Sequence, residues 1–301
     1  TQREIESIRL AQGIENYWPF HELVNYRELN TPGDDYAPIV SENFLYFTSA
    51  RQASGIYAAT GTPYTKLFRA RSEDLRVDVS GIQALPEFPN EEGLNQAAMA
   101  ISPDGNTLIY ARGNSTSPRD LPETALFASY FRGGGFTLPI WLPVNEEENW
   151  WNSTPAFSPD GEELYFASNR PGGYGGIDIY KATKLANGDF GNAVNLGPNV
   201  NTPGNELFPR PAPDGKFFFA SDGHPGFGKL DLFVAEQDEN GNQVIKNLGE
   251  NINSQADDFA IFFTNYPKEG FLSSNREGGI GNDDIYYFED KTPKPKIVNV
   301  L

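Results

Sequence analysis

The chain has 301 residues, of which 23 are Lys or Arg and 41 are Asp or Glu, so its formal net charge is −18. This charge repels the phosphates of nucleic acids and anionic lipids, which disfavours both as partners. The absence of cysteine excludes disulfides, thiol nucleophiles and cysteine-bound metals. With 22 Phe, 14 Tyr, 30 Gly and 23 Pro, the composition predicts an all-β chain of short aromatic strands separated by turns. No apolar run reaches the roughly 18 residues of a membrane helix, so direct membrane insertion is not expected.

Residues 1–20 are expected to lead into the main domain from a preceding one. Within them, residues 3–12 place apolar side chains at helical spacing with charges between, which predicts a short N-terminal helix. The chain starts on Thr1 and ends on an apolar run, and we therefore expect it to be a fragment of a longer protein.

One structural unit recurs along residues 21–290. Each copy has a strand, a turn and an aromatic strand; three turns read Pro-Asp-Gly, at residues 103–105, 159–161 and 213–215, and two degenerate copies lie outside them. Equivalent positions in the five copies are Ser49, Arg112, Ser168, Ser221 and Ser274, at spacings of 63, 56, 53 and 53 residues. Two more strands follow in each copy. Four short antiparallel strands per repeat predict one blade of a β-propeller, and five repeats predict a five-bladed ring.

The ring needs one more outer strand to close its last blade. Residues 22–29 look like a strand, and residues 30–33 (Asn-Thr-Pro-Gly) repeat the connection at 201–204. We expect this N-terminal strand to complete the fifth blade and remove an exposed sheet edge. The C-terminal tail at 296–301 is the alternative. Residues 291–301, which begin Lys-Thr-Pro-Lys-Pro-Lys, are expected to be a linker into a following domain.

The first two repeats are longer than the others, and most of their extra residues fall between the second and third strands. In a propeller these loops share a face with the connections between blades. Insertions on one face of a repeat array often mark its binding face, although drift in unselected loops is an equal alternative.

Several segments resemble the PD40, or TolB-like WD40, repeats of Bacteroidota OmpA-family proteins. These segments are residues 35–38, 47–49, 158–161, 168–180, 195–204 and 221–226. The resemblance covers residues 21–290 and implies a periplasmic protein tied to the outer membrane. It implies a helical domain before the propeller and a peptidoglycan-binding domain after it. The member type it suggests is a PorE-like component of the type IX secretion system. Residues 66 and 125 depart from the Asp of the repeat, which puts a uniform ligand site in doubt.

A candidate partner-binding face comes from the loops on the side where blades connect. Trp150 and Trp151 form an aromatic pair between the second and third repeats, where they either anchor a partner or plug between blades. Arg170 and Arg276 lie in equivalent loops and could bind a partner or make a structural contact. The remaining members of this candidate face are Tyr174 and His224.

Three acidic residues, Asp178, Asp231 and Asp284, recur at the start of the third strand of the last three repeats. Each follows a Gly-rich turn. An Asp in that position commonly accepts backbone N–H groups of the preceding loop, so we expect structural caps in place of a ring of functional carboxylates.

No constellation of catalytic residues stands out. Among the acidic runs, which include 146–148, 257–258 and 283–284, none stands out as a catalytic pair. The first two fall in the connections between blades, where solvated carboxylates are the expected explanation. Two histidines, His21 and His224, are too few for a His-rich metal site, and the sequence has no nucleophile elbow, phosphate-binding loop or dinucleotide fingerprint. We therefore expect no catalytic residue, metal or cofactor.

These observations lead to three hypotheses. The leading one is a noncatalytic interaction scaffold in the periplasm that binds envelope proteins and meets peptidoglycan only through a flanking domain. The rival is a propeller that binds or cleaves cell-envelope glycan, which requires a pair of carboxylates. The third is a receptor for an extended peptide across the central channel.

Overall fold

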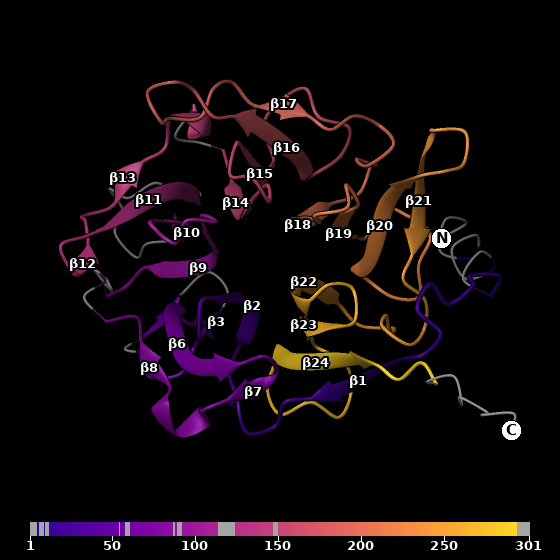
Figure 1. Cartoon of the computed structure of the whole chain (residues 1–301), viewed down its shortest axis with the longest axis horizontal. Coiled ribbons are helices and arrows are strands. Elements are labelled where there is room, and N and C mark those ends of the chain that lie inside the picture. The colour runs from indigo at the N-terminus through magenta and orange to yellow at the C-terminus, as the bar shows by residue number, and fades with distance from the viewer. Residues whose placement is uncertain are drawn as a thin grey trace, which may run out of the picture.

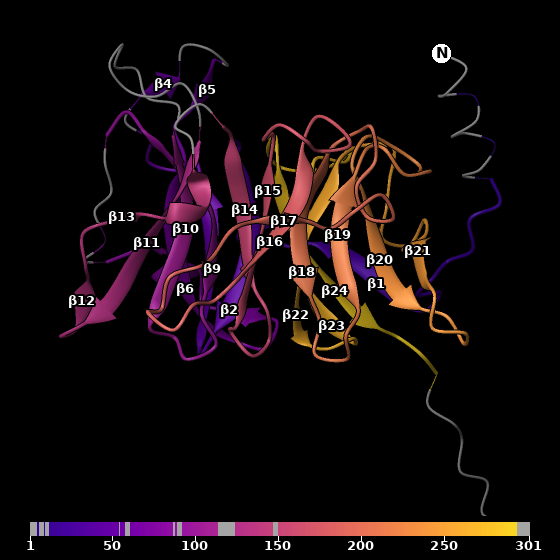
Figure 2. The ribbon, with the colours of Figure 1, turned by 90° about the horizontal axis from the view of Figure 1, so that it is seen from above.

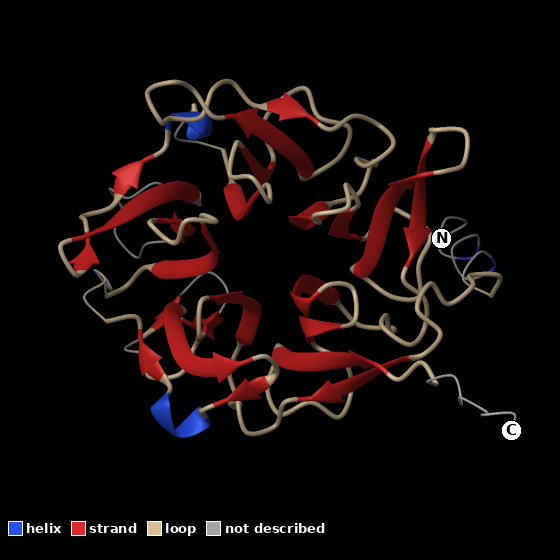
Figure 3. Cartoon of the chain, in the orientation of Figure 1, coloured by secondary structure: helices blue, strands red, loops and turns tan. Residues whose placement is uncertain are grey.

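The computed structural model describes residues 12–53, 55–57, 61–86, 88, 92–113, 124–146 and 150–293, together with Ile5 and Arg9. In this part of the chain five antiparallel sheets are arranged as a ring (Figure 1), and one further two-stranded hairpin lies outside them. Helical structure within the ring is confined to two short 3-10 turns (Figure 3). The predicted five-bladed β-propeller is confirmed. None of the described helices is long and apolar enough to cross a membrane.

Each blade runs from an inner strand at the centre of the ring to a short outer strand. Blade one contains β2 (Asp35–Ser41), β3 (Phe44–Ser49), β6 (Lys66–Glu73), β7 (Arg76–Val77) and β8 (Gln83–Ala84). Blade two contains β9 (Asn95–Ile101), β10 (Thr107–Gly113), β11 (Ala125–Arg132), β12 (Gly135–Phe136) and β13 (Ile140–Trp141). Blade three contains β14 (Asn152–Phe157), β15 (Glu163–Ser168), β16 (Asp178–Thr183) and β17 (Val194–Asn195). Blade four contains β18 (Glu206–Pro211), β19 (Phe217–Ser221), β20 (Asp231–Gln237) and β21 (Gln243–Asn247).

Blade five is built from both ends of the described chain. Its strands are β22 (Asp258–Asn265), β23 (Glu269–Ser274), β24 (Asp284–Asp290) and the N-terminal β1 (His21–Asn25). β1 pairs with β24 along its whole length, from His21 opposite Asp290 to Asn25 opposite Tyr286. The N-terminal strand therefore closes the ring, as the sequence predicts. The tail at 294–301 lies outside the described residues, as does most of the expected N-terminal helix, of which Ile5 and Arg9 are helical.

The inner strands share a bulge at the same step. One residue in each has a positive φ of 41° to 54°, and the pairing with the second strand shifts there; the five residues are Ala37, Ala98, Thr154, Phe208 and Ala260. Positive φ is strained for residues with a side chain, and a bulge re-aims the side chains that follow it. The bulges of Ala37, Ala98 and Phe208 also donate their N–H groups to a hydroxyl of the preceding blade. At these three positions the hydrogen bond from the bulge joins neighbouring blades along the wall of the central channel.

Aromatic side chains of the second and third strands form the core within the blades. Phe219 of β19 stacks on Phe233 of β20 with ring centroids 5.9 Å apart, and Phe166 packs on Tyr180 in the same way. The loops between these strands lie on the face where blades connect, which we call the junction face. On this face the insertion in blade one forms the hairpin of β4 (Ile56–Tyr57) and β5 (Thr62–Pro63), which projects above the ring (Figure 2). Part of the blade-two insertion, residues 114–123, lies outside the described residues.

Candidate functional site

The junction face is held together by a polar network that recurs in blades one, three and five. An arginine two residues after the second strand donates to that strand's last serine, to the first residue of the inner strand and to a backbone carbonyl of the blade connection. The arginines are Arg51, Arg170 and Arg276; their carbonyl partners belong to Leu29, Val144 and Ile252. In these three blades the arginine side chain therefore holds the backbone that connects the blade to the preceding one.

Two of the candidate partner-binding residues, Arg170 and Arg276, are members of this network. Arg170 is 7% exposed and donates to Val144 O at 2.7 Å and Glu146 Oε1 at 2.9 Å. Burial lowers the pKa of its guanidinium. Such a buried, fully bonded side chain has little left to offer a partner protein.

His224 takes the place of the arginine in blade four. One of its ring nitrogens lies 2.9 Å from Val200 O, the carbonyl of that blade connection, and its ring packs on Phe219 and Phe233. Burial lowers its pKa, so the ring is neutral at pH 7. His224 is therefore a structural contact of the junction face.

The aromatic candidates lie in the same loops but do not form one surface. Trp150 is partly exposed and its ring lies 5.3 Å from the guanidinium of Arg170. Trp151 is also partly exposed, and its backbone N–H donates to Asn169 Oδ1 at 2.7 Å. Tyr174 is 50% exposed. The structure brings together Trp150 and Arg170 only.

The repeated aspartates accept backbone N–H groups of the loop before their strand. Asp178 accepts from Tyr174 at 2.6 Å and from Gly175 at 2.9 Å. Asp231 and Asp284 are bonded in the same way by the N–H groups of Phe227 and Ile280. All three side chains are buried at 1% exposure. They shape the loops that surround the junction face.

Three other carboxylates gather where blade five meets blade one. Asp34 and Asp283 form a parallel backbone bridge, and Asp35 N–H donates to Asp283 O at 2.8 Å. Asp257 lies at the start of the neighbouring inner strand, where Asn275 Nδ2 donates to it at 2.8 Å. All three side chains are partly exposed, so the cluster is open to solvent on the junction face. We call these residues the acidic junction.

The acidic junction perturbs one of its own members. Partial burial and then the charges of Asp34 and Asp257 together raise the pKa of Asp283 to about 7, against a hydrogen bond from Asn275 that lowers it. Burial, with the charges of Asp283 and Asp34, also raises the pKa of Tyr36 beneath them. The raised pKa lets the Asp283 carboxyl hold a proton closer to neutral pH than an ordinary Asp does, so it has a proton to donate. A protonated carboxyl beside a second carboxylate is an acid–base pair.

The sequence analysis noted Asp257 and Asp283 among the acidic residues but did not connect them with each other or with Asp34, because the three come from separate loops. The signal that points to the cluster is the set of positions where a residue differs from its equivalents in the other repeats. Asp283 stands where blades three and four have Ile177 and Leu230, and Ala50 stands where blades three, four and five have an Asn or Asp next to the serine. Within the described residues, no group of three or more His, Cys, Asp or Glu side chains is arranged to hold a metal ion, so we assign no metal to the junction.

The fold is shared with solved structures of low sequence identity. A family 117 glycoside hydrolase, Zg3597 of the marine bacterium Zobellia galactanivorans, matches with a TM-score of 0.53 and 17% identity over 91% of each chain. A thermostable family-43 glycoside hydrolase matches with a TM-score of 0.56 and 12% identity over 91% of this chain and 97% of that one. TolB from Acinetobacter baumannii matches with a TM-score of 0.47 and 14% identity over 94% of this chain and 67% of that one. No family model matches the chain, and no curated protein matches its sequence.

These comparisons correct the expectation that the propeller is a noncatalytic scaffold. The ring has the fold of glycoside hydrolases, although identities of 17% and 12% extend the likeness to the fold alone. The expectation failed because it rested on the lack of a local motif. In a propeller, side chains that meet at one junction come from loops far apart in the sequence, as Asp34 and Asp283 do.

Proposed function

We propose that the protein is a carbohydrate-active propeller that binds a cell-envelope glycan over the junction face and cleaves a glycosidic bond. The observation behind this proposal is the acidic junction, in which Asp283 has a pKa of about 7 beside Asp34 and Asp257. Glycoside hydrolysis requires a general acid with a raised pKa and a second carboxylate across the scissile bond.

The surroundings of each carboxylate suggest its role. Asp283 donates its proton to the glycosidic oxygen as the bond to the leaving sugar breaks, and a water that loses its proton to the second carboxylate forms the new bond to the anomeric carbon. No hydrogen bond from a described residue holds the side chain of Asp34, because Ala50 occupies the place of an amide partner, so Asp34 is free to act as the second carboxylate. Asp257 is fixed by Asn275 and by the N–H of Leu230 at 3.1 Å, and its charge helps to keep Asp283 protonated.

The test is an activity screen of the purified chain on envelope polysaccharides and chromogenic glycosides. We expect hydrolysis of at least one substrate, and a loss of about 100-fold or more in Asp283→Asn. Asp222→Asn is the matched control, because Asp222 lies at the equivalent junction of blades three and four. Failure to bind or hydrolyse any envelope glycan contradicts the whole proposal. Binding with hydrolysis that survives Asp283→Asn contradicts the role of Asp283.

We further infer that the parent protein works in the periplasm, in association with the outer membrane and with envelope proteins such as type IX secretion components. The support is the resemblance of residues 21–290 to PD40 repeats of OmpA-family proteins. Peptidoglycan would then be held by a flanking domain close to the propeller. Fractionation of native cells tests the location, and a protein confined to the cytoplasm contradicts it.

A further inference from the structure

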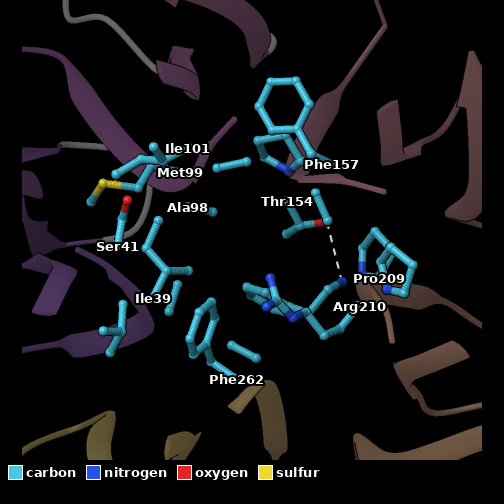
Figure 4. A pocket seen from close by; sticks show the side chains of 18 of the residues that line it. Ile39, Ser41, Ala98, Met99, Ile101, Thr154, Phe157, Pro209, Arg210 and Phe262 are labelled. Atoms are coloured by element: carbon cyan, nitrogen blue, oxygen red, sulfur yellow. Dashed lines mark hydrogen bonds between the residues drawn. The ribbon is translucent and has the colours of Figure 1, made fainter. Parts of the chain in front are cut away.

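A cavity occupies the end of the central channel opposite the junction face. Its volume is about 380 Å³, and the inner strands of all five blades line it together with the turns that follow β2, β9 and β14. Apolar side chains, among them Ile39, Met99, Phe157 and Phe262, surround the space (Figure 4). This size and lining suit a small organic ligand.

Arg210 is the single cationic residue among the described residues that line this cavity. It reaches from β18 into the space, and its guanidinium lies 4.0 Å from the centroid of the Phe262 ring (Figure 4). In the described part of the chain no hydrogen bond or ion pair engages its side chain, and Glu42 at the rim is not paired with it. Burial lowers its pKa to about 10, so the guanidinium still carries its charge at neutral pH.

The three arginines of the junction-face network provide a contrast with Arg210. Arg51, Arg170 and Arg276 each bond a serine, a carbonyl and an inner-strand side chain. Arg210 is partly buried, and its guanidinium stacks on Phe262 without a hydrogen bond or ion pair from a described residue, so its five N–H donors in a planar fork remain available to a carboxylate. Arg210 thus has the charge and donors for an anion that the chain itself does not supply.

The cavity walls limit what else the ligand can contain. Pro38, Pro155 and Pro209 have no N–H to donate, and the bulge N–H groups of Ala37 and Phe208 are already bonded to hydroxyls. The hydroxyls of Ser102 and Ser158, which also line the cavity, already donate to Asp104 and Asp160, so the described lining offers a sugar few free donors. An apolar body with one acidic group satisfies both the walls and the arginine.

We propose that this cavity binds a carboxylate carried on a small apolar body, with Arg210 pairing the carboxylate and the inner strands packing against the body. The carboxylate could belong to a free aliphatic or aromatic acid or to the apolar C-terminal residue of a peptide. The site lies at the other end of the channel from the acidic junction and does not depend on the proposed glycan cleavage.

Titration calorimetry with defined probes tests the ligand class. The probes are octanoate and 3-phenylpropionate as free acids, the tripeptide Ala-Ala-Phe, and the amides of the last two as neutral controls. We expect the acids to bind and the amides to bind about tenfold more weakly or worse. Binding of the free acids assigns the site to small acids, and binding of the tripeptide alone assigns it to a chain terminus. No binding, or equal binding of acids and amides, overturns the proposal.

Variants test the role of Arg210. Arg210→Gln should weaken binding of the acids by about tenfold or more, and Arg210→Lys, which keeps the charge but loses the fork, should lie between. Arg132→Gln is the control, because Arg132 is an exposed arginine away from the cavity. Circular dichroism checks that each variant folds. Asp283→Asn should bind the acids normally, which separates this site from the acidic junction. Unchanged binding in folded Arg210→Gln and Arg210→Lys overturns the proposal.

Discussion

The junction between blades five and one and the junction between blades three and four have the same backbone and different side chains. In both, a parallel bridge joins the residue before a third strand to the residue before the next inner strand: Asp283 with Asp34 in one, Ile177 with Asn205 in the other. The first pair brings two carboxylates together. The second combines an aliphatic side chain with an amide.

The partners of these residues differ as well. Asn205 gives its backbone and side-chain N–H groups to Asp222, each at 2.7 Å. Ala50 stands in the place of Asp222 at the other junction and leaves Asp34 without such a partner. The junction of blades three and four thus forms the same backbone bridge without a pair of carboxylates. Two partly buried carboxylates that meet there are therefore not required by the scaffold, and their presence is best explained by function.

Exchanging one residue between the junctions should have the largest effect. Asp283→Ile, which copies Ile177, should reduce glycoside hydrolysis by about 100-fold or more because the general acid is lost. It should also raise the free energy of unfolding at pH 8 by about 1 kcal/mol, because an apolar side chain replaces a partly buried charge. Rate assays and urea unfolding measure the two effects. Ile177→Val is the control and should change neither; an Asp283→Ile protein that keeps its activity contradicts the assignment.

The caps of the two junctions should behave alike. Asp178→Ala and Asp284→Ala each leave backbone N–H groups of the preceding loop without an acceptor. We expect each to lower the free energy of unfolding by about 2 kcal/mol. Thermal and urea unfolding of both variants provide the measurement. A large loss at one junction and none at the other would show that the two do not share a scaffold.

The sequence predicts what repeats and misses what departs from the repeat. Spacing and the Pro-Asp-Gly turns predict five blades and the closing strand, because each blade is a local chain of hairpins. The acidic junction depends on which loops meet across the ring closure. Asp34 and Asp283 are 249 residues apart in the sequence and become neighbours only when β1 pairs with β24. Likewise, nothing in the sequence around Arg210 shows that its side chain enters the channel with no partner.

Removing one charge from the acidic junction should shift its pH profile. Asp257 contributes to the raised pKa of Asp283, so Asp257→Asn should lower that pKa from about 7. Because the rate requires protonated Asp283, the alkaline limb of the profile should move to lower pH by up to about one unit. Hydrolysis rates measured between pH 4 and pH 9 locate the alkaline limb of the profile. Asp222→Asn, at the equivalent junction, should leave it in place, and a shift to higher pH in Asp257→Asn contradicts the model of charge coupling.

The smallest expected effect is on the pH dependence of stability. Folding raises the pKa of Asp283 and of buried Asp231 from 3.8 to about 7, so the folded protein binds more protons than the unfolded chain between these values. The stabilisation is full below about pH 4 and is lost as pH rises through 7, so the wild-type melting temperature should fall from pH 5 to pH 8. Asp283→Asn and Asp231→Asn should each flatten this slope, whereas Asp222→Asn should not. A slope that is the same in Asp283→Asn and the wild type would show that Asp283 is ionised in the folded protein across this range, and the acidic junction would then have no proton to donate.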